Sequence, residues 1–146
     1  MSEIPNNELP TSFWIIGGVF LLWNFLGLMI YYDQVTMSPE MLADTFNAEQ
    51  QAFLENMPLW ATSAYAIAVT AGVIASLLLL VRNALALPLF VVSLVGVIVQ
   101  DINSFVVNDG LAVWGSSALY LPTLVLVLCV VEIWYSRSAK AKGWLS

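Results

Sequence analysis

Three uncharged polar residues lie near the middle of long apolar stretches of this sequence, namely Asn24, Thr70 and Ser93. A polar side chain is costly in the hydrocarbon interior of a membrane unless it finds a partner. If the three converge, they form a polar pocket at the midplane, where transporters bind their substrates. The favoured alternative is that they hold helices together, because Thr and Ser can bond to their own backbone and only Asn24 requires a partner.

Two acids lie near the ends of these stretches. Glu132 is about one helical turn from the end of the last stretch, and Arg82 should lie at a similar depth, so the sequence predicts an ion pair between them. Asp101 ends the third stretch and is expected to face water. Because no acid, base or histidine is expected between these two ends, we do not predict a proton relay within one subunit.

The residue sets that enzymes and metal proteins use are missing. The chain has no histidine and a single cysteine, Cys129, so the usual ligand sets for zinc and haem are largely absent. It has no glycine-rich phosphate loop, no nucleophile elbow and no paired carboxylates. We therefore predict no enzyme activity, no cofactor and no metal. An enzyme alternative would depend on outer acids such as Asp101 and Asp109.

Composition indicates a membrane protein. The chain is 60% hydrophobic and 10% charged, whereas soluble proteins carry about a quarter charged residues. Its net charge of −6 argues against a nucleic-acid partner, because binding phosphates requires a basic patch. The expected surroundings of the chain are therefore a lipid bilayer.

Four apolar stretches predict the fold. Each has about 18 to 23 residues, enough to cross a hydrocarbon core of roughly 30 Å as a helix. The sequence therefore predicts an all-α, polytopic membrane protein in which residues 1–146 form a single four-helix bundle. The expected spans are Phe13–Tyr32, Leu59–Val81, Ala84–Ile102 and Ala118–Tyr135.

The distribution of charge predicts the topology. All basic residues fall after the second or the fourth span, and cytoplasmic loops carry the excess of Lys and Arg. The connections after the first and third spans contain acids and no base. We therefore expect both termini in the cytoplasm, and we place the protein in the inner (plasma) membrane of a bacterium.

The connection between the first two spans predicts an outer amphipathic helix over about residues 39–56, with a break near Asn47. Ser38 is a good N-cap, and Pro39 suits the first helical position. An apolar face recurs at helical spacing and is a candidate docking surface, formed by Leu42, Phe46, Phe53 and Leu54. The helix is interpreted as a structural cap, with a lid or a docking surface as the alternatives.

Four short segments resemble a family of small four-helix bacterial inner-membrane proteins. They are Trp23–Gly27, with its Trp-Asn-x-x-Gly pattern, and the segments Gln34–Glu40, Pro58–Ala61 and Lys142–Leu145. Members of this family often carry the label "sugar transporter", so the resemblance implies transport as a function class. It assigns no binding residues.

Two functions follow from these observations. The first is an accessory or interaction subunit of a membrane assembly, which binds another membrane protein through its helices. The alternative is a transporter of a small neutral, sugar-like solute, which would work as a dimer because four helices barely enclose a pathway. The sequence identifies no small-molecule ligand.

Overall fold

The computed structural model describes residues 8–146, and they form helices joined by short turns, as predicted. The α-helices are α1 (Thr11–Thr36), α2 (Pro39–Thr45), α3 (Ala48–Glu55), α4 (Leu59–Leu80), α5 (Ala86–Asp101), α6 (Gly110–Trp114) and α7 (Tyr120–Ala141). A π-helical segment, η1 (Ile102–Val107), continues α5, and a 3₁₀ turn, η2 (Ser116–Leu119), leads into α7.

Four helices are long and apolar enough to cross a membrane, which confirms the predicted bundle. They are Thr11–Thr36, Leu59–Leu80, Ala86–Val107 and Ser116–Ala141. The third helix runs further than its predicted end at Ile102, and the fourth further than Tyr135. The segment after Ile102 is mostly helical. A helix satisfies its own backbone hydrogen bonds, so it continues past the point where the apolar sequence ends.

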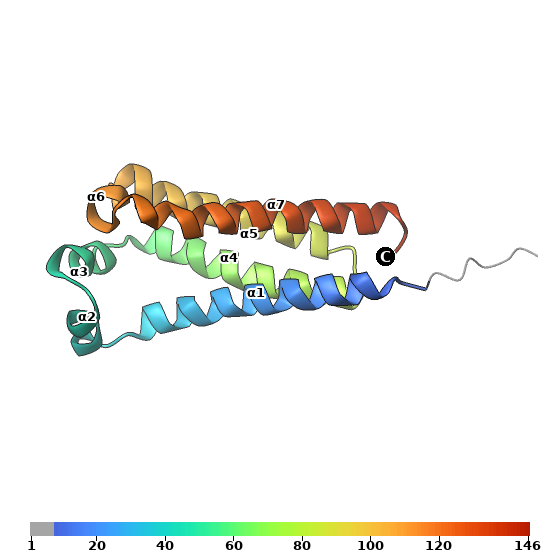
Figure 1. The fold of residues 1–146 in the computed structure, drawn as a ribbon, viewed down its shortest axis with the longest axis horizontal. Coiled ribbons are helices and arrows are strands. Elements are labelled where there is room, and N and C mark those ends of the chain that lie inside the picture. Colours follow the sequence, from blue (N-terminus) through green and yellow to red (C-terminus); the bar gives the residue numbers. More distant parts are fainter. Residues whose placement is uncertain (1–7) are drawn as a thin grey trace, which may run out of the picture.

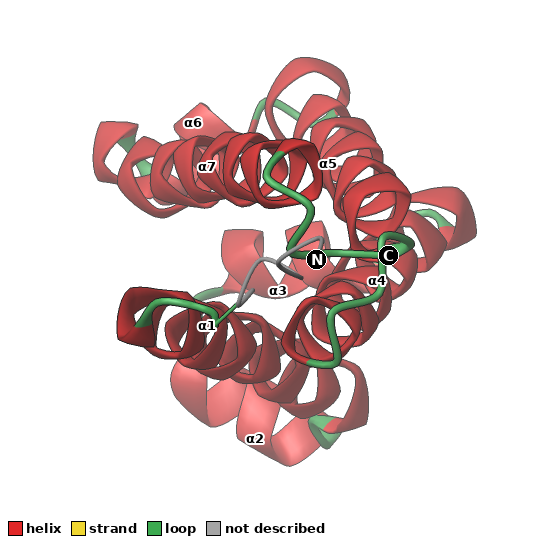
Figure 2. Cartoon of the chain, turned by 90° about the vertical axis from the view of Figure 1, so that its right-hand side faces the viewer, coloured by secondary structure: helices red, strands yellow, loops and turns green. Residues whose placement is uncertain are grey.

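The spanning helices pack in chain order: α1 on α4, α4 on α5 and α5 on α7. Figure 2 looks along the bundle and shows these helices in that order around it. Figure 1 shows α2, α3 and α6 together at one end, which we call the cap end, and the C-terminus at the other, which we call the tail end. The two ends are built differently, and the difference defines the candidate site.

The tail end is closed by apolar side chains. We call Phe13, Phe20, Leu79, Phe90 and Leu145 the tail-end cluster, and all five are at most 6% exposed. The segment after α7 is held against the turn between α4 and α5 by two backbone hydrogen bonds, from Ser146 N to Arg82 O at 2.9 Å and from Ala84 N to Ser146 O at 3.1 Å. These bonds place Leu145 in the cluster.

The cap end is covered by two short helices, which meet at the predicted break. Ser38 caps α2 by accepting a hydrogen bond from Met41 N, and Asn47 caps α3 in a reciprocal capping box with Gln50. The rings of Phe46 and Phe53 pack edge-on against Trp114 of α6, with centroids 5.6 and 5.9 Å away.

This packing favours a cap over the predicted docking surface. Its members, Leu42, Phe46, Phe53 and Leu54, are half-buried, and the face points toward the bundle and α6. Phe46 and Phe53 of this stripe pack on Trp114, and Leu42 and Leu54 line the space beneath the cap. The structure thus supports the interpretation of this segment as a cap.

Close approach of α4 and α5 depends on Gly96. A Cβ at this position would lie 2.8 Å from Ala64 O and 2.9 Å from Ala68 Cβ, and the carbonyl belongs to a backbone that cannot yield easily. We expect Gly96→Ala to lower the free energy of unfolding by about 1–3 kcal/mol, the usual cost of overpacking. The measurement is unfolding in mixed detergent micelles. Gly18→Ala is the matched control, because nothing lies within 4 Å of its Cβ position. Equal stability of the two variants would contradict the prediction.

Candidate functional site

Asn24 of α1 is the centre of a hydrogen-bonded cluster within the bundle. Its Nδ2 lies 2.8 Å from Phe20 O, 2.8 Å from Glu132 Oε1 and 3.1 Å from Ser76 Oγ. Ser76 is itself a donor to Gly72 O at 2.8 Å, so its oxygen is free to accept from Asn24. An amide oxygen in place of Nδ2 would face acceptors, which fixes the orientation of the amide.

Glu132 lies near the middle of α7 and is 2% exposed. Its carboxyl group accepts from Asn24, and the predicted ion pair with Arg82 is not formed. Arg82 lies in the turn at the tail end, where its Nε donates to Trp144 O at 2.8 Å. The prediction was wrong because α7 continues to Ala141, well past the end of the apolar stretch, and Glu132 is correspondingly deeper.

Ser76 of α4 completes the cluster and was not identified from the sequence. A serine within an apolar helix commonly bonds to the carbonyl four residues earlier, as Ser76 does to Gly72. Ser76 also accepts a hydrogen bond from Asn24, and this second role cannot be recognised from the sequence. The nearby Gly72 provides the room, because a Cβ there would collide with Asn24 Oδ1.

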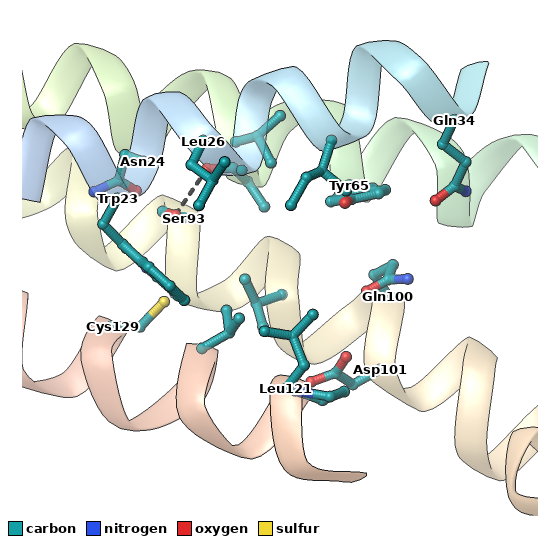
Figure 3. A pocket seen from close by; sticks show the side chains of 17 residues that line it. Trp23, Asn24, Leu26, Gln34, Tyr65, Ser93, Gln100, Asp101, Leu121 and Cys129 are labelled. Carbon is teal, nitrogen blue, oxygen red and sulfur yellow. Dashed lines mark hydrogen bonds between the residues drawn. The ribbon is translucent and has the colours of Figure 1, made fainter. Parts of the chain in front are cut away.

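A cavity of about 270 Å³ lies beside this cluster, between α1, α4, α5 and α7 (Figure 3). We call it the solute cavity. Its inner end is formed by Trp23, Asn24, Ser93 and Cys129, and Figure 3 shows Trp23 reaching from α1 toward Cys129 of α7. The cavity extends from there toward the cap end. Its inner end therefore lies at the depth of the buried cluster.

The structure brings together two of the three predicted midplane residues. Asn24 and Ser93 both line the cavity, whereas Thr70 is exposed on the outside of the bundle and takes no part. On α4 the cavity is lined by Ala68 and Val69, and the helical repeat of 3.6 residues places Thr70 beyond that face. The expected convergence is therefore correct for Asn24 and Ser93 and wrong for Thr70.

Two of the polar groups at the inner end of the cavity accept hydrogen bonds. Ser93 donates its hydroxyl hydrogen to Ala68 O at 2.8 Å, which leaves its oxygen as an acceptor. With Nδ2 held by the cluster, Asn24 presents Oδ1 on the cavity side (Figure 3). Within residues 8–146, no donor is bonded to this oxygen. A ligand that hydrogen-bonds to these two oxygens must therefore supply donors, such as hydroxyl groups.

The end of the cavity nearer the cap carries more polar side chains: Gln34, Tyr65, Gln100 and Asp101. Asp101 was expected to face water, but it lines the cavity, and its Oδ2 is buried without a hydrogen-bond partner in the described part of the chain. Directly after it the helix widens into η1, and π-helical segments occur frequently at functional sites.

A second cavity, of about 810 Å³, lies under the cap helices. It shares the lining residues Ile30, Gln34 and Leu121 with the solute cavity, so the two spaces adjoin. Phe46 and Leu54 of the cap line it as well. The cap therefore lies over the approach to the solute cavity. This is the position that a lid would occupy, in addition to the structural role of the cap.

Comparisons with protein-family models, with curated proteins and with solved structures find no match. The chemistry of the site must therefore be read from its residues. No Lys or Arg lines the solute cavity, and residues 8–146 contain no group of three or more His, Cys, Asp or Glu side chains that could hold a metal ion. The lining contains hydrogen-bond acceptors, amides and the aromatic rings of Trp23 and Tyr65.

Proposed function

We propose that this membrane protein binds a small, neutral, hydroxylated solute in the solute cavity and carries it across the bilayer, with a second copy completing the pathway. The observation that carries the proposal is a cavity that reaches from the cap end to Asn24, at the middle of α1. Substrate sites at this depth, between helices, are typical of transporters. The resemblance to proteins labelled "sugar transporter" points to the same class.

The lining suits a ligand rich in hydroxyl groups and disfavours an anion. With no basic residue in the lining, an anion would lack a partner. The acceptors Asn24 Oδ1 and Ser93 Oγ suit hydroxyl donors, while the amides of Gln34 and Gln100 can both donate and accept. Trp23 and Tyr65 add flat apolar surface, on which the carbon face of a sugar or polyol can pack.

The contrast between the two ends supports transport over simple binding. The cap end contains both cavities, whereas the tail-end cluster closes the other end. Closure of one end is what alternating access requires of one conformation. If the cap end lies outside and the termini lie in the cytoplasm of a bacterium, as the charge pattern predicts, we assign this conformation to the outward-facing state.

The exposed faces of α1 and α7 support a second copy. Only 17% and 11% of their apolar windows are buried within the chain, against 39% for α4. In a dimer these faces would extend the walls of the cavity. The remaining surface contacts lipid.

The role of accessory subunit remains the second candidate. Its support is the small size of the chain and the same exposed helix faces. It loses one argument, because the apolar face of the cap packs on Trp114. Reproducible co-purification with a larger membrane complex, without binding of any solute, would favour it.

Filling the cavity tests the proposal without touching the buried cluster. Gly27 lines the cavity, and its Cβ position has only Val69 Cγ1 nearby, at 3.8 Å, so a larger side chain can enter the space. We expect Gly27→Leu to weaken binding of radiolabelled glucose, xylose or glycerol by roughly tenfold or more, the equivalent of about 1.4 kcal/mol. The measurement is equilibrium binding to the protein in nanodiscs.

Gly18→Leu is the matched control for Gly27→Leu. It makes the same change on the same helix, at a position with nothing within 4 Å of the Cβ. Wild-type affinity is expected in this variant. If Gly27→Leu also bound with wild-type affinity, or if none of the three probes bound to the wild-type protein, the solute cavity would not be the site of a neutral hydroxylated ligand.

A further inference from the structure

We infer that Glu132 is a proton-binding site linked to the solute cavity through the amide of Asn24. This inference rests on the proposed function for the identity of the ligand. Three observations carry it: the burial of Glu132, its hydrogen bond to Asn24, and the position of the same amide at the inner end of the cavity.

The first observation is a carboxyl group without a counter-charge. Glu132 is 2% exposed in the middle of a spanning helix, and none of the described cations forms an ion pair with it. An ionisable residue in such a place is expensive, and its presence indicates a function. A structural hydrogen bond to Asn24 would be equally well made by glutamine, which carries no such cost.

The second observation is that one amide serves both sites. Nδ2 donates to Glu132 Oε1 at 2.8 Å, and Oδ1 faces the cavity as an acceptor. When Glu132 is a carboxylate, it holds Nδ2 and keeps Oδ1 toward the solute. When a proton from water binds to the carboxylate, the group becomes a weaker acceptor and gains a donor. One of the three acceptors that hold Nδ2 is then weakened, so Oδ1 is held less firmly at the inner end of the cavity, while Phe20 O and Ser76 Oγ still accept from Nδ2.

Binding of a proton and binding of the solute therefore oppose one another. A solute that donates a hydroxyl hydrogen to Oδ1 favours the carboxylate form of Glu132 and so lowers the affinity of Glu132 for a proton. By linkage, binding of the proton lowers the affinity for the solute by the same factor. Ser136, one turn further along α7, is fully buried, and its Oγ has no hydrogen-bond partner among the described residues. It extends the buried polar groups on this face of α7 from Glu132 toward the tail end.

The other titratable groups around Glu132 are few. Cys129 and Tyr135 lie on its own helix, and Tyr135 packs against Phe13 and Phe20. From α5 and α4 the nearest are Asp101 and Tyr65, both nearer the cap end of the cavity. On α1, the titratable groups lie at the cap end, and they are Tyr31, Tyr32 and Asp33. The basic residues lie in the turn after α4, in the last turns of α7 and after α7. Of these groups, only Asp101 needs a control of its own.

The test measures binding of glucose, xylose or glycerol as a function of pH. In the wild-type protein, affinity should fall as the pH is lowered through the protonation of Glu132. In Glu132→Gln, which keeps an acceptor for Asn24, affinity should no longer respond to pH over that range, whereas Asp101→Asn should retain the response. A response that persists in Glu132→Gln, that is absent from the wild-type protein, or that has the opposite sign overturns the inference.

A second measurement needs no solute and no stable variant of Glu132. Infrared difference spectra of the wild-type protein should show the carbonyl band of a protonated, buried carboxyl group appearing on acidification. The pH at which this band reaches half of its full intensity should change in Asn24→Leu and stay the same in Thr70→Val. If the three probes fail to bind but this band behaves as described, the proposed function fails and the proton site stands. If the band is absent or indifferent to Asn24, the inference fails by itself.

Discussion

Replacing Asn24 with Leu is expected to lower the free energy of unfolding by about 2–5 kcal/mol, and replacing Glu132 with Leu in the same chain should restore most of that loss. Asn24 Nδ2 provides the hydrogen bond to the Glu132 carboxyl group, at 2.8 Å. Leucine at position 24 removes that bond and leaves a buried polar group without its donor. When both positions are apolar, no group is left unsatisfied, and the helices can pack as they do elsewhere in the bundle.

This prediction is checked by a double-mutant cycle of Asn24→Leu and Glu132→Leu, measured by unfolding in mixed micelles. A coupling energy that makes the double variant more stable than Asn24→Leu alone is the expected result. Thr70→Leu is the control, because it makes the same kind of change at an exposed position. Additive losses for the two changes would mean that Asn24 and Glu132 do not depend on one another. Solute binding should be lost in both variants that lack Asn24, even where stability returns.

Much of the fold could be predicted because it follows from length and apolarity. The bilayer requires about 20 apolar residues for each crossing, and four such stretches are visible in the sequence. The cap at Ser38 was also predictable, since side-chain oxygens at helix starts satisfy backbone donors, and the predicted break near Asn47 is where α3 begins. The extension of α7 to Ala141 was not, because the polar residues after Tyr135 say nothing about where its backbone hydrogen bonds end.

The site could be predicted only in part, because the sequence does not specify how each helix is rotated. Asn24 stood out by its chemical type, and its need for a partner was correct. The identity of that partner was not predictable, because the sequence pattern placed Glu132 at the membrane edge with Arg82 and did not single out Ser76. Thr70 and Ser93 could not be distinguished from the sequence. Only the packing of α4 against α5 places Thr70 outside the bundle and Ser93 in the cavity.

The tail-end cluster allows a second large effect, from Leu145→Asp. Leu145 is 6% exposed among apolar side chains, and a carboxylate there would be buried without a partner. Since burying an unpaired charge costs several kcal/mol, we expect the segment after α7 to leave its place against the turn between α4 and α5. The loss of Leu145, and of the contact between Trp144 and Phe13, should then open the tail end to water.

Labelling of a cysteine introduced at Ser136 measures this opening. Ser136 is fully buried, so Ser136→Cys, in a chain with Cys129→Ala, should react slowly with a membrane-impermeant thiol reagent. Adding Leu145→Asp should speed the reaction by roughly tenfold or more, since about 1.4 kcal/mol of lost closure gives that factor. Lys140→Asp is the control, because it places the same acid on the exposed face of α7. Unchanged labelling in a folded Leu145→Asp variant would show that other contacts close the tail end, and alternating access would then require a different moving part.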